Sequence, residues 1–330
     1  MHTRVLRNTP RNLATLAHAL RRGQLVAVPS ETVYGLACLA TDAAACEQVF
    51  AAKGRPRTDP LIVHVHSMAQ ARTLAVWNDT AQRLAKRFWP GPLTLVLPKT
   101  ELVPDMATAD LPSVAIRMPA HPVFRALLKT LNAPLAAPSA NPFGYISPTT
   151  SEHVKKGLGG RIPYILEGGD CERGLESTIL DARTPERISL LRAGAITLED
   201  IAKCLGHAPL RTTTPPPQEK DVAAVVPGML TKHYSPRTAI ELHETIPAEI
   251  PPTDAALYFQ RRGEAEGKVS PNQFYLTEQG ALEHAARNLF ARLHALDDGT
   301  WTRIHVEMAP CDTGLGLAIN DRLRRAASRG

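Results

Sequence analysis

Residues 53–65 read KGRPRTDPLIVHV, in which three cations, two prolines and a glycine occupy six of the first eight positions and an apolar run follows directly. The preceding segment, 42–54, begins at Asp42, a good helix N-cap, and ends at Gly54, a good C-cap, so it predicts a helix. The apolar run predicts a buried strand in which His64 lies on the face opposite Val63. The stretch is therefore a helix end, a stiff cationic loop and a core strand, which indicates an α/β fold.

The chain on both sides of this stretch continues the alternation of short apolar strands and helices. Strands are predicted at LVAV, LIVHV, LTLVL, SVAIRM and PLAAPSAN, and helices at 13–20, 79–89 and after Pro122. This pattern predicts an open mixed sheet covered by helices. The last hundred residues repeat it at smaller scale, with strands at AALYF, FYL and RIHVE, a long helix from Thr277 and a last helix over 314–327. We expect a second, smaller α/β domain of about three strands there.

A clear break in composition separates the two parts. The segment RTTTPPPQEKD, 211–221, contains three consecutive prolines, which exclude a packed helix or a central strand. Further prolines follow up to Pro236. We therefore predict a domain over 1–210, a linker over 211–237 and a small domain over 238–330.

Charge and cysteine content narrow the function classes. Residues 1–210 hold 24 Lys and Arg against 17 Asp and Glu, whereas the remainder holds 14 against 15. This surplus suits an anionic partner, although many solvated surfaces carry as much. The five cysteines form no CxxC pair, and no histidine cluster has zinc spacing, so we expect free thiols and no metal bound by protein ligands. No secretory signal or membrane span is recognisable, so we expect a cytoplasmic protein without membrane contact.

Polar side chains gather where predicted strands end. Arg117 points off the buried strand SVAIRM, and hydroxyl-rich turns follow at PSETVYGLA, APSAN and LESTIL, with Arg192 at the end of another strand. The helix dipole would explain one of the cations in the 53–57 loop, but not all three. Together these groups indicate a site for a polyanion such as a nucleoside triphosphate. No GxxxxGK[ST] loop and no complete GxGxxG occur, so side chains would have to hold the phosphates.

Six of these motifs carry a family resemblance. In order, PSETVYGLA, KGRP..DPLIVH, WPGPLTLVL, SVAIRMP, APSAN and STIL resemble the YrdC-type L-threonylcarbamoyladenylate synthases. PGMLTKHYSP and GLGLAINDRLRRAAS resemble the two-domain members. The resemblance implies an open twisted sheet with a concave basic cavity and a Rossmann-like C-terminal domain. It also implies that L-threonine, bicarbonate or CO2 and ATP give L-threonylcarbamoyl-AMP and pyrophosphate. A threonylcarbamoyl transferase complex would then use the product to modify adenosine in tRNA.

The resemblance also implies site residues. Lys53 and Arg55 are expected to act on the phosphates as the catalytic pair. L-threonine is expected to contact Thr32, His64, Arg117, Ala137 and Ser177. ATP is expected to contact Lys53, Arg55, Asp59, Ser113, Ser139, Asn141, Ser147, Arg192 and Tyr234. Mg2+ is expected to be held mainly by ATP, and no tightly bound organic cofactor is implied.

Asp59 departs from the family, which usually has Asn before PL. A carboxylate beside phosphates repels them, so we expect Asp59 to bind Mg2+ or a hydroxyl instead. The linker, with Tyr234 reaching back over the nucleotide, is a candidate lid for a reaction whose intermediates decompose in water.

Two other readings compete with the synthase. A basic concave domain could chiefly bind RNA without nucleotidyl transfer, and a weak RNA contact fits either reading, but the sequence has no RGG tract and few aromatic residues for base stacking. Carbamoyl transfer in hydrogenase maturation uses similar domains, but those proteins carry zinc pairs and an acylphosphatase part that have no counterpart here. His64 read alone is more typical of a structural histidine.

Overall fold

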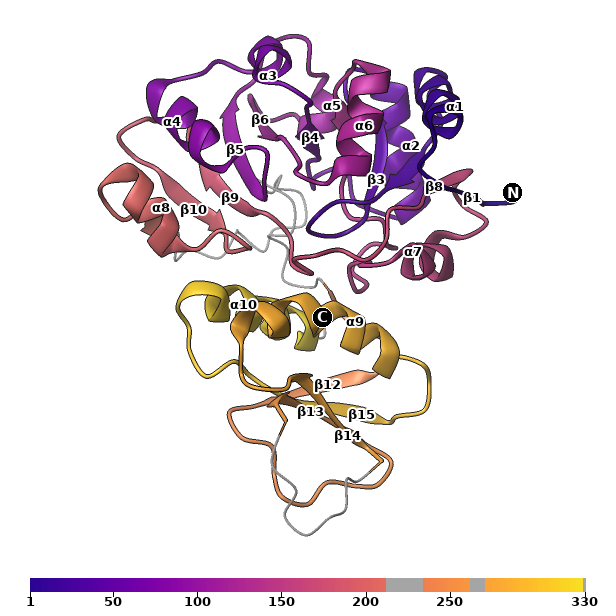
Figure 1. Ribbon diagram of the computed structural model, residues 1–330, viewed down its shortest axis with the longest axis vertical. Helices are drawn as coiled ribbons and strands as arrows, with labels where there is room; N and C mark the ends of the chain where they lie inside the picture. Colours follow the sequence, from indigo (N-terminus) through magenta and orange to yellow (C-terminus); the bar gives the residue numbers. More distant parts are fainter. Residues whose placement is uncertain (212–233, 262–270, 329–330) are drawn as a thin grey trace.

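Two separate β-sheets organise the chain, one above the other in Figure 1. The computed structural model describes residues 1–211, 234–261 and 271–328. Within these residues, no helix is both long and apolar enough to span a bilayer.

The larger sheet is mixed and has 11 strands in the order β1-β8-β2-β3-β7-β4-β6-β5-β9-β10-β11. The strands are β1 (Arg4–Leu6), β2 (Val26–Val28), β3 (Gly35–Leu39), β4 (Ile62–His64), β5 (Leu93–Pro98), β6 (Ser113–Arg117), β7 (Leu135–Ala136), β8 (Tyr164–Leu166), β9 (Thr178–Asp181), β10 (Ser189–Arg192) and β11 (Leu210–Arg211). The helices of this part are α1 (Pro10–Arg21), α2 (Ala43–Lys53), α3 (Met68–Leu74), α4 (Asp79–Phe88), α5 (Asp105–Thr108), α6 (Pro122–Leu131), α7 (Ser151–Leu158) and α8 (Leu198–Leu205).

The two faces of the large sheet are covered differently. One face carries the largest apolar core, to which α2, α4, α7 and α8 contribute. On the other face, α1 and α6 cover β2, β3 and β7 with a second apolar cluster. Beside α6, over β4, β6 and β9, that face carries only a small apolar patch of Ile62, Val96, Ala115 and Ile179. This is where side chains from the strand ends converge.

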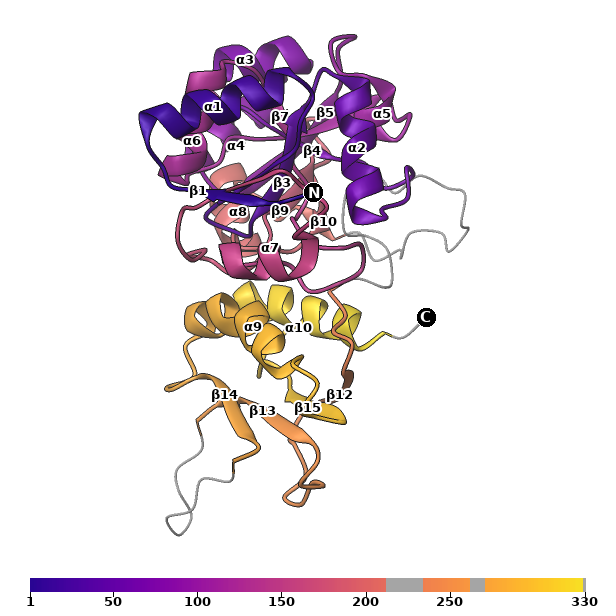
Figure 2. The same ribbon diagram turned by 90° about the vertical axis from the view of Figure 1, so that its right-hand side faces the viewer.

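The smaller sheet is parallel and has the order β12-β15-β13-β14. Its elements are β12 (Ala239–His243), β13 (Ala255–Gln260), β14 (Gln273–Thr277), β15 (Arg303–Glu307), α9 (Leu282–Leu296) and α10 (Gly314–Ala327). Both helices lie between this sheet and the large-sheet part (Figures 1 and 2). They cover one face of the small sheet and pack with the other side against the first domain.

One apolar cluster crosses the boundary between the two parts. It joins residues of α9 and α10, such as Leu289, Phe290 and Leu323, with Val33 and Leu175 of the large-sheet part. At the same boundary a Cβ on Gly174 would lie 2.3 Å from the carbonyl oxygen of Arg287, so only glycine allows this close approach. The two parts therefore share a continuous core.

Most of the predicted elements are confirmed. The helix with Asp42 as N-cap and Gly54 as C-cap, the strands LIVHV and SVAIRM with their alternating faces, and the last helix all appear as expected. The mixed α/β fold with a smaller α/β domain is confirmed as well.

Three details were wrong. The helix expected from Thr277 begins at Leu282, because Thr277 still pairs with Gln260 and Gly280, at φ 79°, turns the chain between strand and helix. The helix from Asp79 ends at Phe88. The small sheet has four strands, because AIELH forms β12.

Of the predicted linker, residues 212–233 lie outside the described residues, and the boundaries at 210 and 237 stay predictions.

Candidate active site

Three neighbouring strands place polar side chains in one row. In the register of the sheet, His64 of β4 lies opposite Arg117 of β6, and Arg117 lies opposite Thr94 of β5. The hydroxyl of Thr94 is 2.7 Å from that of Ser177, which directly precedes β9. Because side chains alternate along each strand, the row faces away from the main core and into the uncovered part of the sheet.

Arg117 is held by three groups. Its Nη1 donates to Thr32 Oγ1 at 2.9 Å, its Nε donates to the carbonyl of Gly91 at 3.2 Å, and its Nη2 lies 2.6 Å from a carboxylate oxygen of Glu31. Burial alone would raise the pKa of Glu31, but Arg117 and the backbone N–H of Ala120 outweigh it, so this pKa lies below its ordinary value. Glu31 is therefore a carboxylate that fixes the guanidinium in the pocket wall.

The turn after β2 supplies the hydroxyl beside Arg117. Ser30 Oγ accepts from the backbone N–H groups of Thr32 and Val33 and donates to the carbonyl of Val33, which makes a tight serine turn. Thr32 Oγ1 lies 2.8 Å from Ser30 Oγ. The turn thus holds Thr32 in place without flexible side chains.

His64 is neutral. Burial, together with the nearby charge of Arg117, lowers its pKa to about 3. Its Nδ1 has no hydrogen-bond partner among the described residues, and its ring packs 5.2 Å from that of Phe124 on α6. An orphaned, buried ring nitrogen in a pocket wall is suited to hydrogen-bonding a ligand.

Arg55 and Arg192 bring two further guanidinium groups to the pocket. Arg55 donates to the carbonyls of Asp59 and Pro60, and its Nη2 lies 2.9 Å from Asp59 Oδ1. Arg192 donates from Nε to the carbonyl of Ser177 and from Nη2 to the Ser177 hydroxyl, both at 3.1 Å. Both arginines are almost fully buried, so their positions are fixed before any ligand binds.

Lys53 lies behind the pocket wall. Its Nζ donates to the carbonyls of Ser139 and Asn141 and so holds the loop that follows β7. Burial, with Arg55 as the second cause, lowers the pKa of Lys53 well below its ordinary value. An anion arriving nearby would favour its charged form.

Tyr234, from the end of the predicted linker, closes one side of the pocket and is held there by helices of the C-terminal domain. Tyr234 is fully buried and stacks on Phe290 of α9 at 5.4 Å. Arg322 of α10 lies 5.1 Å from the centre of the Tyr234 ring, donates to Glu176 Oε2 at 2.7 Å and donates to the carbonyl of Ala193. The other oxygen of Glu176 accepts from the hydroxyl of Ser147.

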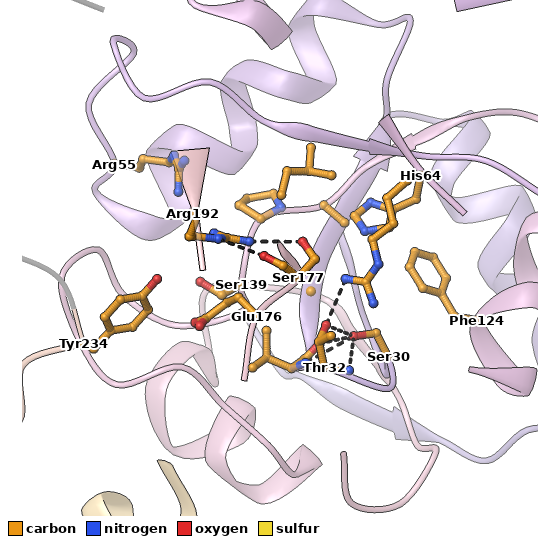
Figure 3. Close-up of a pocket in the computed structure, with 16 residues that line it drawn as sticks. Ser30, Thr32, Arg55, His64, Phe124, Ser139, Glu176, Ser177, Arg192 and Tyr234 are labelled. Atoms are coloured by element: carbon orange, nitrogen blue, oxygen red, sulfur yellow. Dashed lines mark hydrogen bonds between the residues drawn. The ribbon is translucent and has the colours of Figure 1, made fainter. Parts of the chain in front are cut away.

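Most of these side chains line one pocket, which holds about 550 Å3 of space between atoms when the open solvent at its mouth is included. His64, Phe124, Thr32 and Ser30 lie at one end of it in Figure 3, and Arg55, Arg192 and Tyr234 at the other, with Ser177 and Ser139 between them. The pocket therefore has one cationic end with two arginines and a second end built around Arg117.

Comparison with known proteins assigns this architecture. A family model described as telomere recombination matches residues 18–194, and a model of the threonylcarbamoyl-AMP synthase C-terminal domain matches 196–328. Curated threonylcarbamoyl-AMP synthases from Pyrococcus abyssi and Bacillus subtilis are 40% and 38% identical, over 93% and 96% of this chain and 92% of each relative. The chain belongs to the threonylcarbamoyl-AMP synthase family.

A solved structure supports the assignment. The crystal structure of Sua5 from P. abyssi complexed with L-threonine matches this chain with a TM-score of 0.87 and 36% identity, over 99% of this chain and 98% of that one. The fold expected from the resemblance, a YrdC-like domain followed by a C-terminal domain with a parallel sheet, is thereby confirmed.

The structure brings most of the residues expected for this synthase family to the pocket and leaves others behind it. The lining contains Thr32, Arg55, His64, Arg117, Ala137, Ser139, Ser177, Arg192 and Tyr234. Lys53, Asp59, Ser113, Asn141 and Ser147 are buried but do not line this cavity. Lys53 and Ser147 support it through hydrogen bonds to lining residues, Ser139 and Glu176.

Asp59 is placed differently from the expectation. Its carboxylate is fully buried and paired with Arg55 inside the cationic loop, four residues away, instead of facing the pocket. The repulsion that the sequence suggested is removed, because the charge is neutralised before a phosphate arrives. The carboxylate therefore orients Arg55, and the expectation of a Mg2+ or hydroxyl ligand there gains no support.

Three contacts at the pocket could not be read from the sequence motifs. Thr94 is the one hydroxyl residue in LTLVL, and the alternation of side chains along this strand could have predicted that it faces away from the main core. Glu31 and Arg322 gave no such signal, because the first depends on which loop packs against Arg117 and the second on how the two domains dock.

Proposed function

We propose that this pocket condenses L-threonine, bicarbonate or CO2 and ATP into L-threonylcarbamoyl-AMP and pyrophosphate, a nucleotidyl transfer. The observation that carries the proposal is the convergence of Arg55, Arg117 and Arg192 on one cavity, with neutral hydrogen-bonding groups between them. All three guanidinium groups are buried, where a small anion can reach them and an RNA backbone cannot.

The end around Arg117 suits the amino acid. Its guanidinium can pair with the threonine carboxylate, and the neutral His64 can hydrogen-bond the hydroxyl through its unpartnered Nδ1. Phe124 offers an apolar surface to the methyl group, and we assign Thr32, Ala137 and Ser177 to the remaining walls. A methyl in such a pocket is worth about 1–3 kcal/mol, so discrimination against serine should be limited.

The opposite end suits the triphosphate. Arg55 and Arg192 would neutralise the charge that develops on the α-phosphate and the departing pyrophosphate, while Lys53 keeps the loop with Ser139 and Asn141 in position. We assign Ser113, Ser147 and Tyr234 to the rest of the nucleotide. We assign Asp59 to orienting Arg55.

The carbamate of threonine is already anionic, so its attack on the α-phosphorus needs no strong protein base. The catalytic requirement is to hold attacker and phosphorus in line between the two ends of the pocket. Ser177, which contacts both Thr94 of the strand row and Arg192, lies where the two ends meet.

Mg2+ would neutralise phosphate charge when it is bound with ATP. Among the described lining residues the one carboxylate is Glu176, and its two oxygens are already engaged by Ser147 and Arg322. The donor set thus fits an ion held mainly by ATP phosphates and water. The product would pass to a threonylcarbamoyl transferase that modifies tRNA.

The test is pyrophosphate release from ATP, measured with and without L-threonine and bicarbonate. Release should require both co-substrates, and release indifferent to them would refute the proposal. Arg117→Ala should raise the KM for L-threonine at least tenfold while ATP binding persists, since truncating a charged partner costs about 2–5 kcal/mol. Arg83→Ala, an exposed arginine on α4, is the matched control and should leave both unchanged.

A further inference from the structure

The small sheet carries a second group of chemically competent side chains, remote from the pocket. Glu241 and His243 are two positions apart on β12, so their side chains share one face, and His305 of the neighbouring β15 lies opposite Glu241 in the register. Ile240, Leu242, Ile304 and Val306 point the other way, into the core beneath α9 and α10. The three polar side chains therefore share the face of the small sheet that is turned away from the catalytic domain (Figures 1 and 2).

The ligand atoms of this group converge. His243 Nε2 lies 2.9 Å from His305 Nδ1 and 3.7 Å from Glu241 Oε1, and ligand atoms from all three residues lie within 4.8 Å of one another. Two ligands on a tetrahedral Zn2+ are separated by about 3.3 Å, given metal–nitrogen distances of about 2.0 Å. The two observed separations bracket that value, so small side-chain rotations would admit an ion.

Neighbouring side chains orient the ligand side chains, as the residues around a metal site usually do. His305 Nε2 lies 3.2 Å from Asp254 Oδ2, and both side chains are about nine-tenths buried. With its proton on Nε2, His305 donates to this carboxylate and directs its Nδ1 lone pair at His243, which is the carboxylate–histidine arrangement common around zinc. In the metal-bound form the proton of His243 would lie on Nδ1, so that both facing nitrogens could bind the ion. Arg303 pairs with Glu241 Oε2 and leaves Oε1 toward His243.

The local charge also favours a cation. Among the described contacts of the site, Glu241 and Asp254 bring two carboxylates, against one guanidinium from Arg303. Two imidazoles and a carboxylate select a borderline divalent ion such as Zn2+ over Mg2+ or Ca2+, which prefer oxygen ligands.

We propose that this face of the C-terminal domain binds one divalent transition-metal ion, with Zn2+ as the fitting ion, through His243 Nε2, His305 Nδ1 and Glu241 Oε1. Asp254 is the positioning residue that orients His305. The ion would fasten the edge strand β12 to β15, and water would complete its coordination. The sequence alone predicted no such site, because the two histidines are 62 positions apart and the sheet brings them together.

The test uses the full chain, stripped with a chelator and titrated with Zn2+ and, separately, with Co2+, whose visible absorption reports nitrogen ligation in an ordered site. The expected result is one tightly bound equivalent and a Co2+ spectrum of low coordination number. Asp254→Asn should weaken binding by about 10–100-fold. His243→Gln and His305→Gln should weaken it further and abolish the Co2+ spectrum.

Glu241→Gln keeps the test decisive if the histidine variants fail to fold, because this half-exposed position on an edge strand tolerates an isosteric change. This variant should weaken Zn2+ binding at least tenfold. His18→Gln, an exposed histidine on α1, is the matched control and should bind like the wild type. Absence of binding at millimolar Zn2+, or equal affinity in the wild type and folded ligand variants, would overturn the proposal.

Discussion

Arg322→Met tests whether the C-terminal domain supports the pocket wall. The Arg322 side chain is fully buried and the Glu176 side chain is 7% exposed, so the substitution leaves a buried carboxylate with Ser147 as its remaining side-chain partner among the contacts described above. Breaking a buried ion pair from one side costs about 3–5 kcal/mol. The charge of Arg322 is firmly held: burial would lower its pKa, but Tyr234 and Glu176 outweigh burial and raise it above the ordinary value.

The free energy of unfolding, measured by urea denaturation with circular dichroism, gives the comparison. Arg324→Met on the same helix is the control, because Arg324 forms an exposed pair with Asp312 that should be worth no more than about 1 kcal/mol. Adding Glu176→Gln to Arg322→Met should recover about 1–3 kcal/mol, since the uncompensated charge is then gone. The coupling between α10 and the pocket does not exist if Arg322→Met lowers the free energy of unfolding no more than Arg324→Met does. It does not exist either if the effects of Arg322→Met and Glu176→Gln on that free energy simply add.

Three further outcomes follow from the structure. Gly194→Ala should lower both stability and threonine-dependent pyrophosphate release, because the new Cβ would lie 2.4 Å from the carbonyl oxygen of Glu176 and displace the segment before β9; thermal unfolding and the release assay measure this. Lys53→Met should raise the KM for ATP more than that for L-threonine, because the loop carrying Ser139 loses its anchor; equal changes in both would contradict this role. Burial, with nearby His153, lowers the pKa of His294 to about 3, so below pH 6.5 the unfolded chain binds more protons than the folded chain and the free energy of unfolding falls with acidification. His294→Gln should reduce the stability lost between pH 6.5 and 5 by about 1–2 kcal/mol. An unchanged dependence of stability on pH in this variant would refute the assignment to His294.

The sequence predicted the parts of the fold that local patterns determine. The helix from Asp42 to Gly54 carries both of its caps in the chain, and the strands 61–65 and 113–118 place an apolar side chain at every second position on the face of the main core. β12 was missed because every residue of AIELH is partly exposed and two of them are charged or titratable, so its pattern is that of an edge strand rather than a core strand. The start of α9 was wrong because Thr277 is a good cap by type but is already used in the β14 ladder.

The candidate site divides in the same way. Strand ends and alternation were enough to select Arg117 and Arg192, because an arginine on a buried strand has to face a cavity or a counter-ion. His64 read alone was typical of a structural histidine, and only the family resemblance indicated it as a site residue. The pairing of Arg55 with Asp59 could not be deduced, because a carboxylate four residues from an arginine in a loop can turn either toward it or away. The contribution of α10 could not be deduced either, since it depends on how one domain docks on the other.

The row formed by His64, Arg117 and Thr94 imposes a constraint on how this sequence can change. The same strands supply Val63, Ile116 and Leu95 to the main core on their opposite face. A one-residue slip of β6 would therefore turn Arg117 into the main core and an apolar neighbour into the pocket. Single-residue insertions or deletions inside these strands would abolish binding and folding together. Length variation among functional descendants of this chain is therefore confined to the connections between the strands, and substitution is the only route by which the row itself can evolve.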